Sequence, residues 1–399
     1  MSVLKNIINK TKNIIKDIIT NIHNKIFKNK YILRVIRILL TIAFVVFLVL
    51  FINEVFIQPY KLKKSIEKAK ELYHYSEHKP TVEPSKSVPD TEAGEDNTLA
   101  AETDTDSNNT DNSTDNDAKW SENVTPAPTP DPNRDEKGRL KKFVKLLEAN
   151  EDVKGWIRID NINGENDTKI DYVVVQSDPS DPYYYLSRDW ATHEYLKAGS
   201  IFIDAASSVE ENSKNLVIHG HNMTSSDDMF HYLLKYHEIN FLVEHPIISF
   251  DTIYEEALWK VFSIYITPGN NDRGDFFPFT KTEFESDQDF MEFIYQTRLR
   301  SLFDMDDVDI NEADRILTLS TCSYELPNYR TIIVARKVRE GEDPTVNTDY
   351  FRKKKRDERL YPQSFYNHYG GEAPDFPSFE EALENGFVPW YKPINTTGQ

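Results

Sequence analysis

Cysteine is almost absent from this sequence of 399 residues, which contains a single one, Cys322. A lone cysteine cannot form a disulfide within the chain, so a disulfide-stabilised fold is excluded. Exported proteins that use cysteine for structure usually carry it in pairs. Cys322 is therefore either an inert buried side chain or a thiol kept for chemistry, and its polar neighbours Ser320, Thr321 and Ser323 favour the reactive thiol.

Basic residues are outnumbered by acidic ones beyond the N-terminus, and the net charge of the chain is -19. A broad basic face is missing, which argues against a nucleic-acid partner. Between Lys86 and Lys119 the sequence has ten acids and no base. Such a segment buries too little apolar surface to offset the entropy cost of ordering. Residues 58–136 are therefore predicted to be a juxtamembrane segment followed by a disordered acidic stalk.

The first 37 residues reverse this balance, with nine basic side chains and one acid, Asp17. An uncharged run, Ile38 to Ile52, follows directly and, with its apolar flanks, predicts a transmembrane helix over residues 31–57. No small-residue cleavage site comes after the run, which disfavours a cleaved signal peptide. Because bases precede the span, residues 1–30 should stay in the cytoplasm and the rest should lie outside. We expect a single-pass protein of the cell membrane, in contact with membrane lipid.

Residues 137–340 combine many short β-type runs with few helices and no βαβ alternation, which indicates a mainly β fold closed or nearly closed into a barrel. A capping box, Ser286 with Asp289, predicts a long helix after residue 286, and Ser226 is a second candidate cap. The predicted strands are Gly155–Ile159, Tyr172–Gln176, Ser200–Ile203, Asn215–Ile218, Ile247–Phe250, Leu258–Ile266, Arg315–Thr321 and Thr331–Val338.

The C-terminal extension, residues 341–399, contains eleven aromatic side chains and the basic run Arg352 to Arg356. It is too aromatic for simple disorder. The sequence leaves two interpretations open, packing on the preceding domain or binding a partner.

Three polar residues at predicted strand ends are the candidates for chemistry. Cys322 ends one strand, where a substrate can reach a thiolate. His221 follows the apolar run at Asn215–Ile218, and its imidazole suits a general acid for a leaving amine. Arg330 begins the next strand and carries fixed donors for an oxyanion. His219 is a rival to His221 or its partner in a metal pair, but no third ligand lies nearby, so we expect no metal or organic cofactor.

Several segments in this region resemble blocks of the sortase family in the family's order. Thr318–Cys322 reads TLSTC and resembles the TLxTC signature, and Asn215–Met223 and Arg330–Arg336 resemble the histidine segment and the arginine-led closing strand. The long helix after Ser286 is similar to class B. The further blocks are Gly155–Ile157, Asp171–Gln176, Tyr184–Leu186 and Gly199–Phe202.

The resemblance covers about residues 137–340 and implies an eight-stranded β-barrel with a Cys322, His221 and Arg330 site. It implies cleavage of an Asn-Pro-x-Thr-like sorting signal after its Thr through a thioacyl-enzyme, with Ser320 and Thr321 as substrate-binding residues. Partners would be surface proteins bearing sorting signals and an amine of a peptidoglycan precursor.

Two alternatives stay open: a sortase that polymerises pilins through a lysine amine, and a membrane-tethered adhesion or scaffold module on a degenerate sortase fold. Two departures from the family pattern are His219, where tyrosine is usual, and the short spacing between Cys322 and Arg330.

Overall fold

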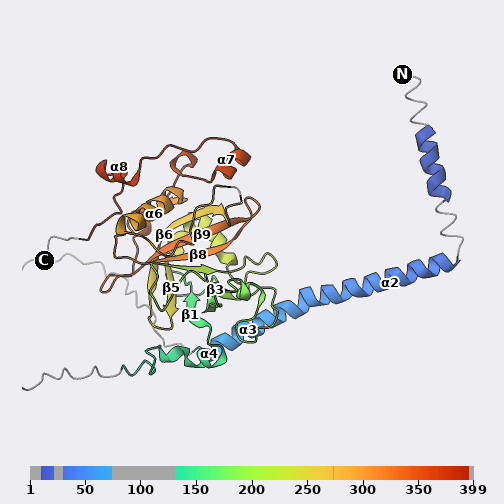
Figure 1. The fold of residues 1–399 in the computed structure, drawn as a ribbon, viewed down its shortest axis with the longest axis horizontal. Helices are drawn as coiled ribbons and strands as arrows, with labels where there is room; N and C mark the ends of the chain where they lie inside the picture. The colour runs from blue at the N-terminus through green and yellow to red at the C-terminus, as the bar shows by residue number, and fades with distance from the viewer. Residues whose placement is uncertain (1–9, 22–29, 74–130, 273, 395–399) are drawn as a thin grey trace, which may run out of the picture.

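The barrel predicted from the sequence is present in the computed structural model, which describes residues 10–21, 30–73, 131–272 and 274–394. Eight strands close in the order β1-β2-β3-β4-β8-β9-β6-β5 (Figure 1). All eight predicted strands are confirmed. Their bounds are β1 Val153–Arg158, β2 Asp171–Val175, β3 Ile201–Ile203, β4 Asn215–His219, β5 Ile247–Thr252, β6 Leu258–Pro268, β8 Ile316–Ser323 and β9 Tyr329–Lys337.

Alternate residues of these strands belong to two different hydrophobic clusters, one inside the barrel and one on its outer face. Leu317 and Leu319 of β8 pack inside the barrel with Ile333 of β9. Ile316 and Ile332 belong instead to a second cluster on the outer face, beneath α6 (Asp287–Arg300). Because side chains alternate along a strand, the even-numbered residues of β8 and β9 face outward.

The predicted cap of α6 is confirmed, since the Ser286 hydroxyl accepts a hydrogen bond from the Asp289 amide at 3.1 Å. The prediction of a helix that begins at Ser226 and includes Met229 is wrong. Met229 has a φ of 59°, in the left-handed region, which a right-handed helix cannot include. Two short helices follow instead, the 3-10 helix η4 (His231–His237) and the α-helix α5 (Ile239–Glu244). Three further short helices precede β3, and they are η2 (Lys141–Phe143), α4 (Val144–Ala149) and η3 (Tyr184–Ser187).

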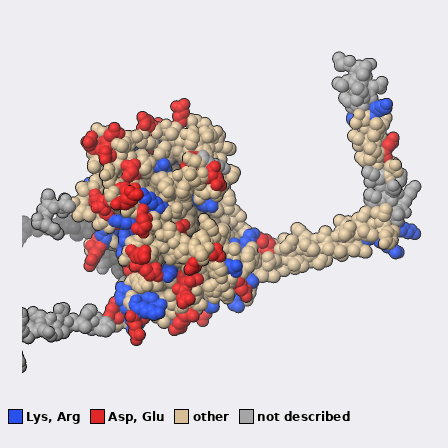
Figure 2. Space-filling model, in the orientation of Figure 1, with Lys and Arg blue, Asp and Glu red and all other residues tan. Residues whose placement is uncertain are grey.

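One helix leads from the N-terminal region to the barrel. It comprises α2 (Lys30–Ile52), the π-helical turn η1 (Asn53–Ile57) and α3 (Gln58–Leu72). Among the described residues it is the one helix long and apolar enough to cross a membrane, and no residue of α2 is buried. Figure 2 shows α2 as a stretch without charge between its basic start and the head.

The part of the expected stalk that the structure describes is helix α3, which packs on the barrel. Leu62 and Ala69 are buried, and the Tyr73 ring stacks on Trp156 with centroids 4.1 Å apart. The Gln58 side chain accepts a hydrogen bond from the Lys197 amide at 2.9 Å. The juxtamembrane part of the predicted segment 58–136 thus includes the lysine-rich helix α3, whose narrow apolar face packs on the head.

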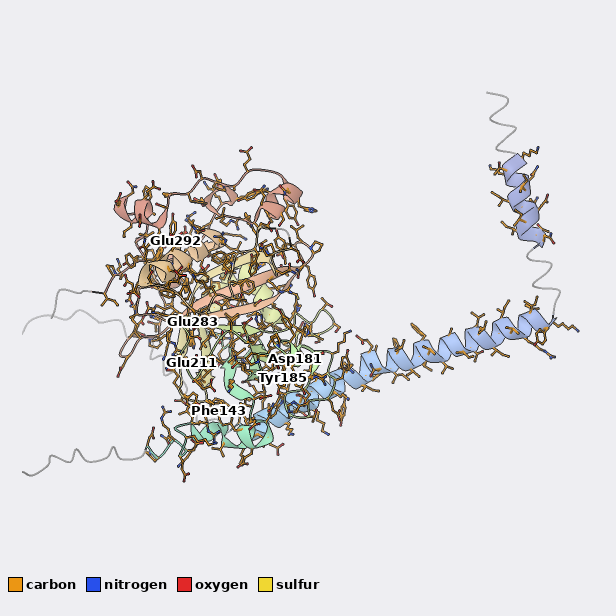
Figure 3. The ribbon with its side chains drawn as sticks, viewed as in Figure 1. Phe143, Asp181, Tyr185, Glu211, Glu283 and Glu292 are labelled. Carbon is orange, nitrogen blue, oxygen red and sulfur yellow. The ribbon has the colours of Figure 1, made fainter. Side chains whose placement is uncertain are left out.

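The apolar cluster beneath α3 extends to α4 and η3. Phe143 and Tyr185, labelled in Figure 3, are fully buried in it together with Trp156. Arg134 donates to the Tyr254 carbonyl at 2.6 Å, so the chain returns to the same end of the head after residue 130. The remainder of the predicted acidic stalk, residues 74–130, lies outside the described residues.

The C-terminal extension packs on the head, which is the first of its two interpretations. Its strand β10 (Arg352–Lys353) pairs with β7 (Phe303–Asp304), and helices α7 (Gln363–Tyr369) and α8 (Phe379–Glu384) follow α6 on one side of the barrel (Figure 1). The aromatic side chains supply the packing. Phe379 and Trp390 join the outer cluster under α6, and Tyr295 of α6 donates to the Pro377 carbonyl at 2.9 Å.

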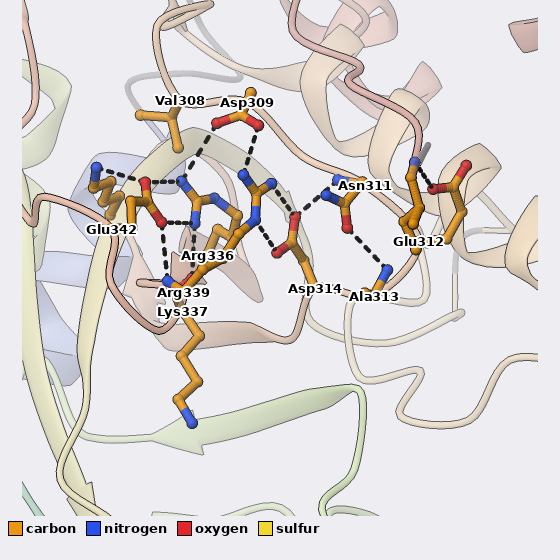
Figure 4. A network of polar contacts seen from close by, with 12 residues as sticks. Val308, Asp309, Asn311, Glu312, Ala313, Asp314, Arg336, Lys337, Arg339 and Glu342 are labelled. Atoms are coloured by element: carbon orange, nitrogen blue, oxygen red, sulfur yellow. Dashed lines mark hydrogen bonds and ion pairs between the residues drawn. The ribbon is translucent and has the colours of Figure 1, made fainter. Parts of the chain in front are cut away.

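Buried charge fixes the start of the extension (Figure 4). Arg336, fully buried, makes two hydrogen bonds to the Glu342 carboxylate at 2.6 and 2.7 Å, and Lys260 donates to the same carboxylate at 2.7 Å. Burial raises the pKa of Glu342, but its bonds to Arg336 and Lys260 lower that pKa more, so it lies well below its usual range. The carboxylate therefore stays charged near neutral pH.

The Glu342→Gln variant should lose about 3 kcal/mol of unfolding free energy at pH 7, because two buried cations lose their main counter-ion. The native carboxyl has a depressed pKa, so its contribution is present above its unfolded value of about 4.5 and declines as pH falls below that. The difference between the variant and the parent should shrink in denaturant titrations below pH 4.5. Glu358→Gln is the matched control, because Glu358 pairs with the half-exposed Arg352 at the surface and its replacement should change the unfolding free energy far less. Equal losses in both variants would contradict this assignment.

Candidate active site

Cys322 and Arg330 lie directly opposite each other on the antiparallel strands β8 and β9. Both are even-numbered and share the outward face that carries Ile316 and Ile332. Residues in this relation have Cβ atoms about 5 Å apart, close enough for their side chains to interact. Both residues are partly exposed, so the two paired positions lie on an accessible part of the barrel wall.

His221 lies beside this pair at the end of β4. Strand β4 runs parallel to β8, and its last residue, His219, pairs with Ser320, so His221 falls near the level of Cys322. The intervening Gly220 donates to the Ser320 carbonyl at 3.2 Å. A Cβ at Gly220 would come within 2.7 Å of Ile201 and Phe230 side-chain atoms, so glycine is required for this approach.

The orientation of the His221 ring is set by a backbone group. Its Nε2 atom lies 2.8 Å from the carbonyl oxygen of Leu186 in η3. A carbonyl can only accept, so Nε2 is the donor in this hydrogen bond and Nδ1 is left for other partners. The sequence could not show this contact, because any residue type can supply a carbonyl.

Asn222 ties the histidine segment to the cysteine strand. Its Nδ2 donates to the Cys322 carbonyl at 3.0 Å, and its Oδ1 accepts a hydrogen bond from His231 Nδ1 at 2.8 Å. Tyr324 lies next to the thiol, where burial and the charge of Cys322 raise the pKa of its phenol. Sequence reasoning missed both residues, although each follows within two positions of a residue it had selected.

The two predicted substrate-binding residues are buried. Ser320 is 2% exposed, and Thr321, 1% exposed, donates its hydroxyl to the Gly220 carbonyl at 2.8 Å. Thr321 therefore helps to hold the β4 end in place, and a direct substrate contact for either residue remains a prediction. The structure thus brings the positions of Cys322, His221 and Arg330 together at the adjoining ends of β8, β4 and β9. Ser320 and Thr321 directly precede Cys322 in β8.

The rival histidine has a different partner. His219 Nε2 lies 2.9 Å from Asp204 Oδ2. Burial raises the pKa of Asp204, but its hydrogen bond to His219 and the charge of that histidine lower the pKa more, to below its usual value. In the part of the chain that the structure describes, no group of three or more His, Cys, Asp or Glu side chains could hold a metal ion.

Known proteins are similar to this chain in sequence. A sequence model of the sortase domain matches residues 159–338. Sortase B of Staphylococcus aureus is 31% identical over 200 residues, 50% of this chain and 75% of the relative. Sortase B of Listeria monocytogenes is 34% identical over 199 residues, 50% of this chain and 73% of the relative.

Solved structures are similar over the same part of the chain. Clostridium perfringens sortase B is 29% identical, with a TM-score of 0.43 over 49% of this chain and 98% of that one. A Staphylococcus aureus sortase B-substrate complex is 32% identical, with a TM-score of 0.43 over 50% and 86%. With two relatives above 30% identity across most of their length, the chain belongs to class B of the sortase family and is a sortase-type cysteine transpeptidase.

Proposed function

We propose that this transpeptidase cleaves an Asn-Pro-x-Thr-like sorting signal after its Thr and transfers the protein to a cell-wall amine. The observation that carries the proposal is the pairing of Cys322 with Arg330 across β8 and β9, with His221 at the adjoining end of β4. A nucleophile, a proton carrier and a cation on neighbouring strands are the groups that acyl transfer requires.

The proposed first half-reaction begins with attack of the Cys322 sulfur on the Thr carbonyl carbon. A carbon–sulfur bond forms, the peptide C–N bond breaks, and the departing amine takes a proton from His221. In the second half-reaction, the acceptor amine attacks the thioacyl carbon and gives its proton to His221. The sulfur leaves as a thiolate, and the site returns to its starting state.

Arg330 is proposed to stabilise the oxyanion of both tetrahedral intermediates through donors fixed before reaction. Its Nη1 donates to the neighbouring Tyr329 carbonyl at 3.1 Å, which leaves the outer edge of the guanidinium for the substrate. Helix α2 is proposed as a single-pass membrane anchor with the basic N-terminus in the cytoplasm, so the catalytic head works outside the cell.

The test uses the full chain in detergent, mixed with Asn-Pro-x-Thr peptides and two kinds of amine, a peptidoglycan-type peptide and a lysine-bearing pilin-type peptide. Mass spectrometry should show cleavage after Thr, a thioacyl adduct on the only cysteine, and transfer to the first amine. Transfer only to the lysine peptide would indicate a pilin-polymerising enzyme. If no sorting-type peptide yields an adduct on a folded chain, the proposed signal is wrong.

The guanidinium of Arg330 packs against Gly269, which makes that glycine a sensitive position. A Cβ built on Gly269 lies 2.9 Å from Arg330 Cζ. Gly269→Ala should displace the guanidinium and lower kcat about tenfold, because small misplacements of catalytic groups are costly. Turnover assays with the exposed neighbour variant Asn271→Ala as control would check this. An unchanged kcat in Gly269→Ala would show that Arg330 tolerates the shift.

A further inference from the structure

The loop between the proposed nucleophile and the proposed oxyanion residue is held by the C-terminal extension. This β8–β9 loop, residues 324–328, directly connects the strand end at Cys322 to the strand start at Arg330. Movement of the loop would therefore act on the two strand ends that carry the sulfur and the guanidinium. Residues that hold this loop in place therefore help to position the two active-site residues.

Helix α7 contacts both ends of the β8–β9 loop through polar groups. The Tyr369 hydroxyl donates to the Glu325 carbonyl at 2.9 Å. The Tyr329 hydroxyl shares a hydrogen bond with Ser364 Oγ at 2.6 Å. These two bonds join residues 35 and 44 positions apart in the sequence.

An apolar cluster lies between these bonds. Leu326 and Tyr329 are 7% and 0% exposed and pack with Ile266, and Tyr361 and Phe365 of the extension cover them. The rings of Tyr361 and Phe365 stack with centroids 4.0 Å apart. The apolar side chain of this loop, Leu326, is thus buried by residues of the C-terminal extension.

The helix that provides this cover is itself anchored. The Ser364 amide donates to Asp275 Oδ2 at 2.6 Å, and the Arg356 guanidinium lies 5.2 Å from the Phe365 ring centre. On the other side of the loop, Glu325 pairs with His237 of η4 at 3.5 Å, and His237 also contacts Thr331 Oγ1 at 3.2 Å. The loop therefore contacts η4 on one side and α7 on the other.

We propose that residues 361–369 are a positioning element for transpeptidation, which clamps the β8–β9 loop so that Cys322 and Arg330 keep their reactive separation. The proposal rests on the catalytic roles proposed above for these two residues. The segment lies beyond residues 159–338, the part matched by the sortase domain. None of its side chains needs to touch the substrate.

The test compares Phe365→Ala with Phe387→Ala in the full chain. Phe387 is a matched control because it lies in the same extension, is 67% exposed, and is absent from the cluster on the loop. Phe365→Ala should lower kcat about tenfold with KM little changed, since the loss is one of alignment. Tyr369→Phe, which keeps the ring and removes the bond to Glu325, should show a smaller fall, and Phe365→Tyr should restore most of the rate.

A second measurement separates alignment from general damage. Because Cys322 is the only cysteine, the pH dependence of alkylation by iodoacetamide reports on its thiolate alone. Phe365→Ala should shift that profile, whereas Phe387→Ala should leave it in place. A folded Phe365→Ala chain with parental kcat and profile would overturn the clamp. Activity that survives loss of Cys322 would instead overturn the proposed function.

Discussion

The Cys322→Ala variant is expected to lose transpeptidation by roughly 10⁴-fold or more, because no other side chain can form the acyl intermediate. The effect should be in kcat, and the variant should still bind the sorting peptide. The rate of peptide cleavage and the mass of the chain after incubation with peptide give two independent readings. The cleavage rate should fall and the mass added by the acyl group should be missing, since the chain has no second thiol that could accept the acyl group.

Ser323→Ala is a suitable control for this variant. Ser323 is the next residue of β8, is 4% exposed, and points to the opposite face of the strand from Cys322. It should retain the parental rate within a few-fold, which would show that a small change in this strand is tolerated. Residual turnover of Cys322→Ala at the parental level would exclude covalent catalysis through this residue.

Arg330→Lys is expected to lower kcat by about 10²- to 10³-fold, the usual cost of removing an oxyanion donor. Lysine keeps the charge but not the planar set of donors, so this substitution tests geometry separately from charge. Initial rates over a range of peptide concentrations would separate the loss in kcat from any change in KM. The effect should persist at high salt, because a short, directed hydrogen bond is screened less than a distant charge.

The matched control is Arg352→Lys in β10. Arg352 is half exposed and pairs with Glu358 at the surface, so its replacement should leave the rate near that of the parent. A parental kcat for Arg330→Lys would mean that Arg330 acts only through its charge. Arg330→Gln would then be the variant that removes the remaining function.

Much of the barrel could be predicted because its strands are short apolar runs separated by turn residues. The same pattern delivered Cys322 and Arg330 to adjacent strand ends, and a hairpin connection places such ends side by side. His221 was harder, because its position depends on a parallel pairing of β4 with β8 across about a hundred residues. Its identification from sequence depended on the family resemblance.

The rest could not be predicted, for two physical reasons. Backbone groups such as the Leu186 carbonyl carry no residue signature, so the contact that orients His221 is invisible in the sequence. The covers of the barrel, α3 and α7, have narrow apolar faces diluted by lysine and polar residues. Such a face indicates only that the helix packs against another part of the protein. Which part that is depends on the folded structure.

With α2 as the proposed membrane anchor, the packing of α3 on the head would hold the enzyme at a fixed distance from the bilayer. Glu54 lies near the end of the predicted transmembrane segment, residues 31–57, and pairs with Lys197 of the head, so with α2 as the proposed anchor the head would lie directly against the bilayer surface. The acidic segment starts after Tyr73 and returns at residue 131, with both ends attached to the head, so its length does not alter that distance. With this proposed anchor, the helix would fix the distance of the thiol from the bilayer, and the proposed sorting signals would have to reach that level.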